Sequence, residues 1–279
     1  DPRVQFVINR MQTYEQTKQV FVWARKYGFK SINVDLIYGL PHQTIDSVEH
    51  TIGLIKQLKP DRIAFYSYAH VPWKSKAQRR YTESDLPPAA LKWEIYERGR
   101  YLLKEAGFKS IGMDHFALEN DPLFVAAEEG KLNRNFMGYT TTQSKLIIGL
   151  GASSISAAQN AFAQNEKIVE DYEAQINAGI LPLVNGHVLN EYDLEVQQTI
   201  HELMCLNKTS IHRNLHAAAF EDNILEKLIS LEADELVEVQ NDKITVTETG
   251  KLFIRNICAA LDPYLFKKDT QTQTFSKAI

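Results

Sequence analysis

The chain has 279 residues, of which 44% are hydrophobic and 24% charged, which is typical of a globular protein and excludes fibrous, disordered and disulfide-rich classes. It lacks the roughly 18–20 uninterrupted apolar residues of a membrane helix and the basic and apolar blocks of a secretion signal. The sequence therefore predicts a cytoplasmic protein without a membrane span. A formal net charge of −4 provides no electrostatic footprint for nucleic acid.

The chain opens on Asp1 rather than on methionine and enters a helical pattern almost at once, which predicts a piece of a longer protein. A string then occurs twice, as YGFKSINVD at residues 27–35 and as AGFKSIGMD at residues 106–114. Each copy follows an amphipathic segment, 14–27 or 89–106, and each contains a glycine suited to the left-handed turn that ends a helix. The repeat predicts two helix–turn–strand units.

The strands of these units, 31–38 and 110–116, are near-continuous apolar runs, as expected for parallel strands buried on both faces. Between them, Thr44 is the expected N-cap of a helix over 45–58, which leads into a strand over 62–68. Residues 145–150 suggest a fourth strand. This alternation of helices and strands predicts an α/β fold with a parallel sheet.

Three or four such units are too few to close an eight-stranded barrel, so we expect residues 1–184 to form part of a barrel. From residue 185 to 279 the pattern changes to a helical, winged-helix-like domain. Its expected elements are helices over 193–205, 215–221 and 224–231, a hairpin of 236–239 with 244–247 around Asn241-Asp242, and a helix over 249–261. Residues 187–279 contain nine Lys and Arg against fifteen Asp and Glu, which disfavours DNA binding.

Polar residues near strand ends are the candidates for chemistry, because working residues collect there in parallel α/β folds. Asp35 shares a strand face with Asn33 and Ile37, and a carboxylate buried there needs an ion-pair partner or a ligand. Asp114 and His115 are expected on opposite faces of their strand, where His115 could be a structural residue or a proton carrier.

Arginine side chains could bind a carboxylate-bearing substrate, and Arg134 is one candidate, although most arginines are solvated. Cys205 and Cys258 lie in apolar segments, which suggests buried thiols rather than a disulfide framework or a metal site. We find neither a catalytic triad nor a metal-ligand spacing in the sequence.

Several strings together resemble a known family. They are VDLIYGLP at residues 34–41 with Gln43-Thr44, GMDHFA at 112–117, RNF-x-GYTT at 134–141 and FSK at 275–277. The set resembles the oxygen-independent coproporphyrinogen III oxidases, which are radical S-adenosylmethionine (SAM) enzymes of heme biosynthesis. The related heme chaperones share the strand motif but have an Asn-x-x-Tyr-Trp pattern where this chain has residues 135–140, so the resemblance favours the oxidases.

The resemblance implies the C-terminal part of a partial (β/α)6 radical-SAM barrel with the appended domain described above. It implies that a reduced [4Fe-4S] cluster cleaves SAM and that the 5'-deoxyadenosyl radical removes a β-hydrogen from a propionate of coproporphyrinogen III. Loss of carbon dioxide and an electron leaves a vinyl group, and two such reactions give protoporphyrinogen IX. The protein would contribute placement and exclusion of side reactions.

By the same resemblance, one SAM molecule contacts Arg10, Asp35 and Ala69, and a second contacts Ile155. Arg10 suits a carboxylate, Asp35 suits a ribose hydroxyl or an ammonium, and the other two suit backbone or apolar contacts. Arg134 and His115 are candidate substrate residues. The expected partners are coproporphyrinogen III and an electron donor such as a flavodoxin-type reductant, with a monomer as the expected state.

The chain also departs from the family pattern. It lacks the cluster motif Cys-x-x-x-Cys-x-Cys, so we expect that motif upstream, no metal site in this chain and no activity from this piece alone. Asn133 stands where a histidine is usual, and residues 143–145 replace an acidic stretch, which leaves the geometry near Ile155 open. The alternative function is a heme-binding chaperone with the same scaffold and no dehydrogenase activity.

Overall fold

The structure is a computed structural model and describes residues 1–210 and 223–266. Residue contacts divide the chain into two compact units, with the division between Val125 and Ala126. The sequence pattern instead predicts a domain boundary between residues 184 and 185. That boundary concerns which parts of the chain fold independently, and it stays a prediction.

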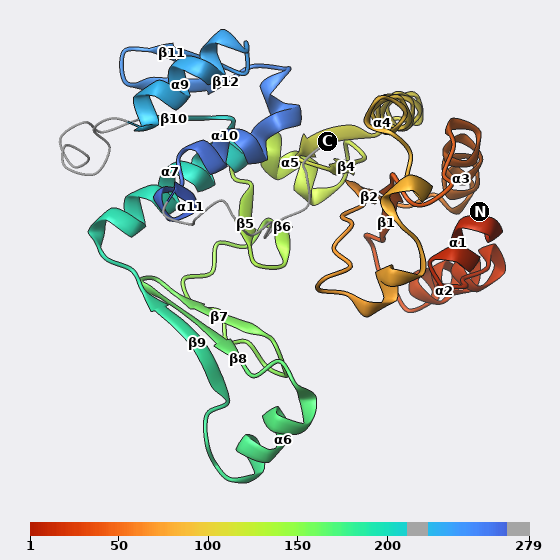
Figure 1. Cartoon of the computed structure of the whole chain (residues 1–279), viewed down its shortest axis with the longest axis horizontal. Coiled ribbons are helices and arrows are strands. Elements are labelled where there is room, and N and C mark those ends of the chain that lie inside the picture. The colour runs from red at the N-terminus through yellow and green to blue at the C-terminus, as the bar shows by residue number, and fades with distance from the viewer. Residues whose placement is uncertain (211–222, 267–279) are drawn as a thin grey trace. The chain divides into compact units, whose positions relative to one another are not determined.

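The first unit alternates helices with strands, and α3 and α4 lie beside strands β1 and β2 (Figure 1). Two short 3-10 helices, Lys76–Arg80 and Glu83–Asp85, precede α4, and helix α5, Pro122–Glu128, crosses the division. The other elements are α1 (Pro2–Val7), α2 (Tyr14–Lys26), β1 (Asn33–Tyr38), α3 (Ile45–Leu58), β2 (Arg62–Ser67), α4 (Ala89–Glu105), β3 (Lys109–Gly112) and β4 (His115–Ala117).

The four strands of this unit form one open sheet in the order β1-β2-β4-β3. Strands β1 and β2 pair in parallel, from Asn33 opposite Arg62 to Tyr38 opposite Ser67. Parallel neighbours need a crossover connection, which α3 provides. The predicted α/β class is confirmed, and the open sheet is consistent with part of a barrel. The prediction of a parallel sheet is wrong beyond β1 and β2, because β4 pairs antiparallel with both β2 and β3.

Local sequence signals explain where the helices begin and end. Thr13 and Thr44 each accept a hydrogen bond from the backbone three residues later, in capping boxes that start α2 and α3. Gly28 and Gly107 follow α2 and α4 with φ of 85° and 90°, a left-handed conformation that glycine adopts without strain. The predicted helices and the turns at both copies of the repeat are therefore confirmed.

Aromatic side chains form the core between the sheet and α4. Tyr38 of β1 lies with its ring centroid 4.8 Å from that of Phe65 in β2 and 5.1 Å from that of Tyr96 in α4. Ile52 of α3 and Ile63 of β2 are fully buried in the same unit. Burial of large apolar side chains supplies the main favourable term in folding, so this cluster fixes the sheet against the helices.

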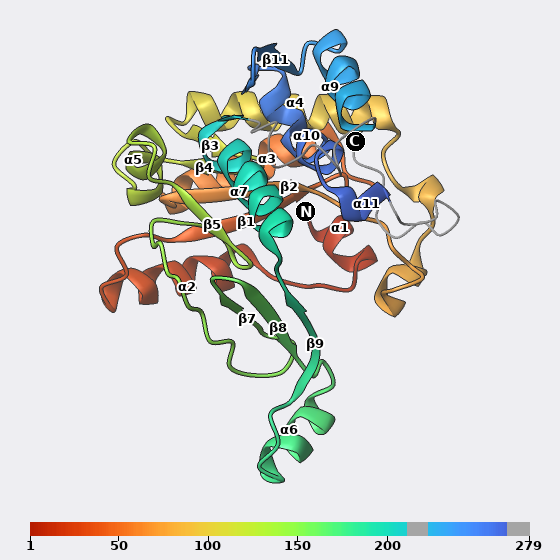
Figure 2. The ribbon, with the colours of Figure 1, turned by 90° about the vertical axis from the view of Figure 1, so that its left-hand side faces the viewer.

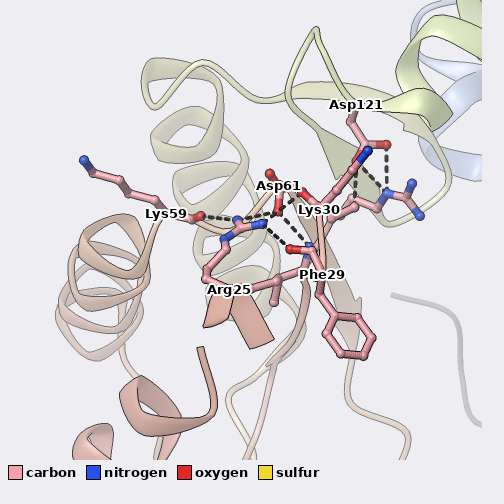
Figure 3. Close-up of polar contacts among 9 residues, drawn as sticks. Arg25, Phe29, Lys30, Lys59, Asp61 and Asp121 are labelled. Atoms are coloured by element: carbon pink, nitrogen blue, oxygen red, sulfur yellow. Dashed lines mark hydrogen bonds and ion pairs between the residues drawn. The ribbon is translucent and has the colours of Figure 1, made fainter. Parts of the chain in front are cut away.

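A polar network ties together the N-terminal ends of β1 and β2 (Figure 3). Arg25 donates to the backbone carbonyls of Phe29, Lys30 and Lys59 and to the Asp61 carboxylate, while the backbone N–H of Ile32 also donates to Asp61.

The buried Asp121 carboxylate makes the neighbouring contacts in Figure 3. It accepts hydrogen bonds from Arg62 Nε, the Ser31 hydroxyl and the backbone N–H of Leu123, at 2.7–2.8 Å. Every oxygen of this buried charge therefore has a donor, as a buried carboxylate requires.

The single strand predicted over 110–116 is wrong. Residues 113 and 114 form a turn between β3 and β4, which pair antiparallel, and β4 also pairs antiparallel with β2. Met113 has a left-handed φ of 47° and follows Gly112 at 148°, so the backbone reverses here. Asp114 lies in this turn rather than opposite His115 on one strand.

Burial of β1 on both faces, another prediction, is also wrong for this chain. Tyr38 is buried, whereas Asn33 and Asp35 on the other face are exposed. In the order β1-β2-β4-β3, strand β1 also lies at the edge of the sheet, and Tyr38 is the one fully buried residue of this strand.

The second unit consists mainly of small antiparallel sheets and helices. Figure 2 shows β7, β8 and β9 as an elongated sheet with α6 beyond one end. Its elements are β5 (Asn133–Asn135), β6 (Gly138–Thr140), β7 (Ile155–Ala158), β8 (Ala161–Asn165), α6 (Val169–Asn177), β9 (Leu183–Val188), α7 (Glu191–Leu206), β10 (Lys208–Ser210), α9 (Asn223–Ala233), β11 (Val237–Gln240), β12 (Lys243–Val246), a 3-10 helix (Gly250–Phe253), α10 (Ile254–Ala260) and α11 (Pro263–Phe266).

The strand predicted over 145–150 is wrong, because this segment contributes a single bridge between Ile147 and Ala157. The winged-helix-like elements are confirmed where the structure describes them. Strands β10, β12 and β11 form an antiparallel sheet, and Asn241 with φ of 56° makes the predicted turn. The predicted helix over 215–221 lies outside the described residues. Among the helices described, none combines the length and apolar character needed to cross a membrane.

Candidate functional site

Strand β1 presents Asn33 and Asp35 on its exposed face. The amide nitrogen of Asn33 donates to Asp35 Oδ1 at 2.7 Å, which orients the carboxylate. The strand register places Ala64 of β2 opposite Asp35 and His115 of β4 opposite Ala64. Paired residues share a face of a sheet, so Asp35 and His115 lie on the same face, two strand spacings or about 10 Å apart.

Arg10 and Asp35 line the same cavity, which has a volume of about 260 Å³. Arg10 follows the turn after α1, and the cavity walls also include residues of β1, the start of α3 and Tyr66 of β2. The structure therefore brings together two of the residues predicted to bind one ligand.

The charges of Asp35 and Arg10 both act on the hydroxyl group of Tyr66. Burial raises the pKa of Tyr66, the negative charge of Asp35 raises it further and the positive charge of Arg10 lowers it. Among the described residues no ion pair joins Arg10 to Asp35 within 4.0 Å. A ligand with a carboxylate and an ammonium or hydroxyl group could therefore engage both side chains.

Gln43 fixes the loop that follows β1 beside this cavity. Its Oε1 accepts from the backbone N–H groups of Gly39 and Leu40, and its Nε2 donates to the Ile37 carbonyl at 3.2 Å. Gly39 has a left-handed φ of 83°, which explains a glycine at this point of the strand motif. The motif at 34–44 thus encodes a strand, a braced loop and the start of α3.

Ala69 lies in the loop after β2, where it is exposed. Its carbonyl accepts a hydrogen bond from Gln78 Nε2 at 3.2 Å, while Gln78 Oε1 accepts from the backbone N–H of Val71. Ala69 is not among the residues that line the cavity of Arg10 and Asp35. Its role in binding SAM stays a prediction.

Ile155 begins β7 in the second unit, opposite Gln164 of β8. A Cβ atom at Gly149 would lie 2.8–2.9 Å from the backbone of Ile155, so only glycine allows the 149–151 segment to pack here. Asn165 Nδ2 donates to the carbonyls of Gly149 and Gly151, which holds this segment in place. Ile155 and Asp35 belong to different units, and the predicted ligand contact of Ile155 is not tested.

Arg134 of β5 lines a second and larger cavity of about 790 Å³, formed entirely by residues of the second unit. The same cavity is lined by Lys145 and His201 and by the apolar side chains of Phe136, Ile147, Phe162, Ile200 and Met204. Sequence reasoning identified Arg134 but not Lys145 or His201, since nothing in the local sequence links these three segments. Tyr66 was also missed, although its register opposite Ile37 places it on the face of Asp35.

The two cysteines do not form a metal site. Burial raises the pKa of Cys205 to about 11 and that of Cys258 to about 12, so both are protonated thiols at neutral pH. Within residues 1–210 and 223–266, no three or more His, Cys, Asp or Glu side chains group together in a way that could hold a metal ion. A [4Fe-4S] cluster therefore does not fit the residues described here.

Comparison with known proteins identifies the family. No family model matches the chain. It is 42% identical to an oxygen-independent coproporphyrinogen III oxidase of Thermostichus vulcanus, over all of this chain and 87% of that protein. It is also 41% and 39% identical to proteins of the same name from Synechocystis and Escherichia coli, over 99% of this chain and 61% of each of those proteins.

A solved structure agrees with these relatives. The coproporphyrinogen III oxidase of Escherichia coli, described as a radical SAM enzyme, superimposes with a TM-score of 0.88 at 38% identity, over 95% of this chain and 62% of that one. The chain thus spans about three fifths of the length of several relatives that it matches. On this likeness in sequence and in fold, the chain belongs to the family of oxygen-independent coproporphyrinogen III oxidases.

Proposed function

We propose that the complete protein converts coproporphyrinogen III to protoporphyrinogen IX by oxidative decarboxylation of two propionates to vinyl groups. This chain would supply binding residues for SAM and for the substrate. The family membership gives the reaction class, and the shared cavity of Arg10 and Asp35 is the single observation that carries the proposal.

In this proposal the chain's residues bind and orient the cofactor. Arg10 pairs with the carboxylate of SAM, because a guanidinium and a carboxylate form charge-assisted hydrogen bonds. Asp35, oriented by Asn33, accepts from the ammonium or a ribose hydroxyl. Ala69 contributes a backbone contact, and Ile155 contacts a second SAM molecule. When bound, SAM supplies the 5'-deoxyadenosyl radical that removes a hydrogen atom from the propionate.

Other parts of the proposal rest on the family resemblance. The three cysteines that hold the cluster would come from sequence upstream of Asp1, so this chain alone would be inactive. His115, on the same sheet face as Asp35, is a candidate substrate contact. A flavodoxin-type electron donor, a monomeric state and a cytoplasmic location stay predictions.

The test is to measure how much SAM the complete, anaerobically reconstituted protein binds at equilibrium. We expect the unaltered protein to bind two molecules, and the Asp35→Asn and Arg10→Gln variants each to bind one of them about 10- to 100-fold more weakly. This range corresponds to the loss of one hydrogen bond to a charged group.

Two exposed positions provide matched controls. Asp234→Asn in the turn after α9 and Lys18→Gln on α2 remove the same charges from exposed positions and should leave both SAM affinities unchanged. If Asp35→Asn and Arg10→Gln bind SAM as these controls do, the cavity does not hold SAM and the proposed roles of both residues fail.

A further inference from the structure

The cavity at Arg134 contains an unsatisfied cationic group. Arg134 Nε is buried and has no hydrogen-bond partner among the described residues. A buried donor without an acceptor costs about 1–3 kcal/mol, and more when it is charged, so such groups are rare in folded proteins. Arg134 also lines a cavity of about 790 Å³, where its guanidinium group can pair with an anionic group of a ligand.

The guanidinium group is held in place by the β5–β6 hairpin and α7. Tyr139 lies opposite Arg134 in the hairpin, and its ring centroid is 5.4 Å from Arg134 Cζ. The Tyr139 hydroxyl donates to the Met204 carbonyl of α7 at 3.0 Å. A cation over an anchored aromatic ring is both stabilised and fixed in direction, so the site is built before a ligand arrives.

The residue before Arg134 is also tied to α7. Asn133 Oδ1 accepts from the backbone N–H of Arg134 at 2.8 Å and contacts His201 Nε2 at 2.5 Å. The nitrogen of the same side-chain amide, Nδ2, donates to the Thr142 carbonyl at 2.9 Å. The strand that bears Arg134 is therefore held from both sides of the cavity wall.

The charge at the cavity wall favours an anion. Arg134 and Lys145 have no ion-pair partner in the described part of the chain. Burial lowers the pKa of His201, so its imidazole is neutral at pH 7 and adds no charge. Asp262 is the one carboxylate among the lining residues, which leaves a net charge of one positive unit.

The rest of the wall is apolar. Phe136 and Phe162 meet edge to face with centroids 5.1 Å apart, and Ile147, Ile200 and Met204 complete the surface. The volume lies within the range of about 300–1,000 Å³ that holds sizeable organic ligands. A ligand suited to this cavity has a large apolar body and at least one carboxylate.

We propose that this cavity binds the tetrapyrrole substrate and that Arg134 pairs with one of its propionate carboxylates, with Lys145 as a second cationic contact. The proposal rests on the proposed function for the choice of a tetrapyrrole. It assigns Asn133, Tyr139 and His201 as positioning residues, because they hold the strand and the side chain of Arg134 rather than the carboxylate.

The test uses the 279-residue chain and coproporphyrin III, the stable oxidised form of the substrate, with porphyrin fluorescence as the measure of binding. We expect Arg134→Gln to raise the Kd about 10- to 100-fold, which is the effect of one buried hydrogen bond to a charge. Arg134→Lys keeps the charge but loses the planar fork, and should give an intermediate Kd. The control Lys243→Gln removes a charge from an exposed site on β12 and should leave the Kd unchanged.

The tetramethyl ester of coproporphyrin III separates charge recognition from apolar binding. We expect the ester to bind the unaltered chain and the Arg134→Gln variant with the same Kd, because its esterified propionates carry no charge that could pair with Arg134. The proposal is overturned if the unaltered chain does not bind coproporphyrin III, or if Arg134→Gln binds it as tightly as Lys243→Gln does. A circular dichroism melt identifies an unfolded Arg134→Gln variant, in which case Arg134→Lys decides.

Failure of this proposal is distinguishable from failure of the proposed function. If the complete protein forms protoporphyrinogen IX and Arg134→Gln leaves its KM unchanged, the reaction stands and the assignment of the cavity is wrong. If coproporphyrin III binding depends on Arg134 but SAM is never cleaved, the cavity assignment stands and the enzymatic proposal is wrong.

Discussion

At the scale of single residues, Asp35 and Asp121 show how differently one chain can treat a carboxylate. Asp121 is buried, and its oxygens accept from Arg62, Ser31 and Leu123. Asp35 is exposed on β1 and accepts from Asn33 alone among the described residues. The hydrogen bonds of Asp121 thus stabilise the fold, while the carboxylate of Asp35 can still accept hydrogen bonds from a ligand.

Asp121→Asn should destabilise the chain by about 2–3 kcal/mol. Breaking a buried ion pair costs about 3–5 kcal/mol, and the partial exposure of Arg62 reduces this penalty because water can solvate the guanidinium. Urea unfolding monitored by circular dichroism measures the change. The exposed control Asp234→Asn should stay within about 0.5 kcal/mol of the unaltered chain, and an equal effect of both variants would contradict the structural role of Asp121.

Residue identity alone predicted some of the site and missed the rest. Asp35 and Arg134 could be named because they lie in strings that resemble a family, and Arg10 was assigned by the same resemblance although no such string contains it. Lys145 follows Arg134 by 11 residues and His201 follows it by 67, and no motif links these three positions, so only the fold shows that they line one cavity. The sequence predicted a buried Asp35 that needs a partner, whereas the structure exposes it and the cost of burial does not arise in this chain.

At the scale of elements, the packing of α4 on β2 depends on a helical glycine. A Cβ atom at Gly99 would lie 2.5 Å from Cε1 of the buried Phe65 ring, while at Gly53 in α3 nothing lies within 4 Å. Packing therefore requires Gly99, whereas Gly53 lowers the stability of its helix and allows no closer packing. The two glycines form a matched pair for substitution.

We expect Gly53→Ala to stabilise the chain by about 1 kcal/mol, which is the difference in helix propensity between the two residues. Gly99→Ala gains the same propensity but forces the Phe65 ring to move, and overpacking costs about 1–3 kcal/mol, so the net effect should be neutral to destabilising by about 2 kcal/mol. Thermal unfolding of the two variants gives the comparison. Equal stabilisation by both substitutions would show that α4 does not pack closely on β2.

Elements with strong local signals were predicted well. Thr44 is the N-cap of α3, and Gly28 makes the left-handed turn that follows α2. The ends of these two helices therefore follow from capping chemistry. The reversal at Met113 was missed because a left-handed methionine has no sequence signature, although Gly112 before it was a weak signal. The short strands β5 to β9 were missed because antiparallel hairpins of three to six residues carry little periodicity.

At the scale of the whole molecule, the proposed function draws on both units. Arg10, Asp35, Ala69 and His115 belong to the first unit, and Arg134 and Ile155 belong to the second. The chain spans about three fifths of several relatives, and its two cysteines are too few to supply the three thiolates of the cluster motif. The reaction is therefore proposed for the complete protein.

The most direct measurement is turnover by the complete protein, reconstituted anaerobically with iron and sulfide and given SAM, a reductant and coproporphyrinogen III. We expect about two molecules of 5'-deoxyadenosine for each protoporphyrinogen IX, because each of the two propionates requires one radical. The Asp35→Asn variant should form both products more slowly than the Asp234→Asn control does. Heme binding without formation of 5'-deoxyadenosine would contradict this account and indicate a chaperone on the same scaffold.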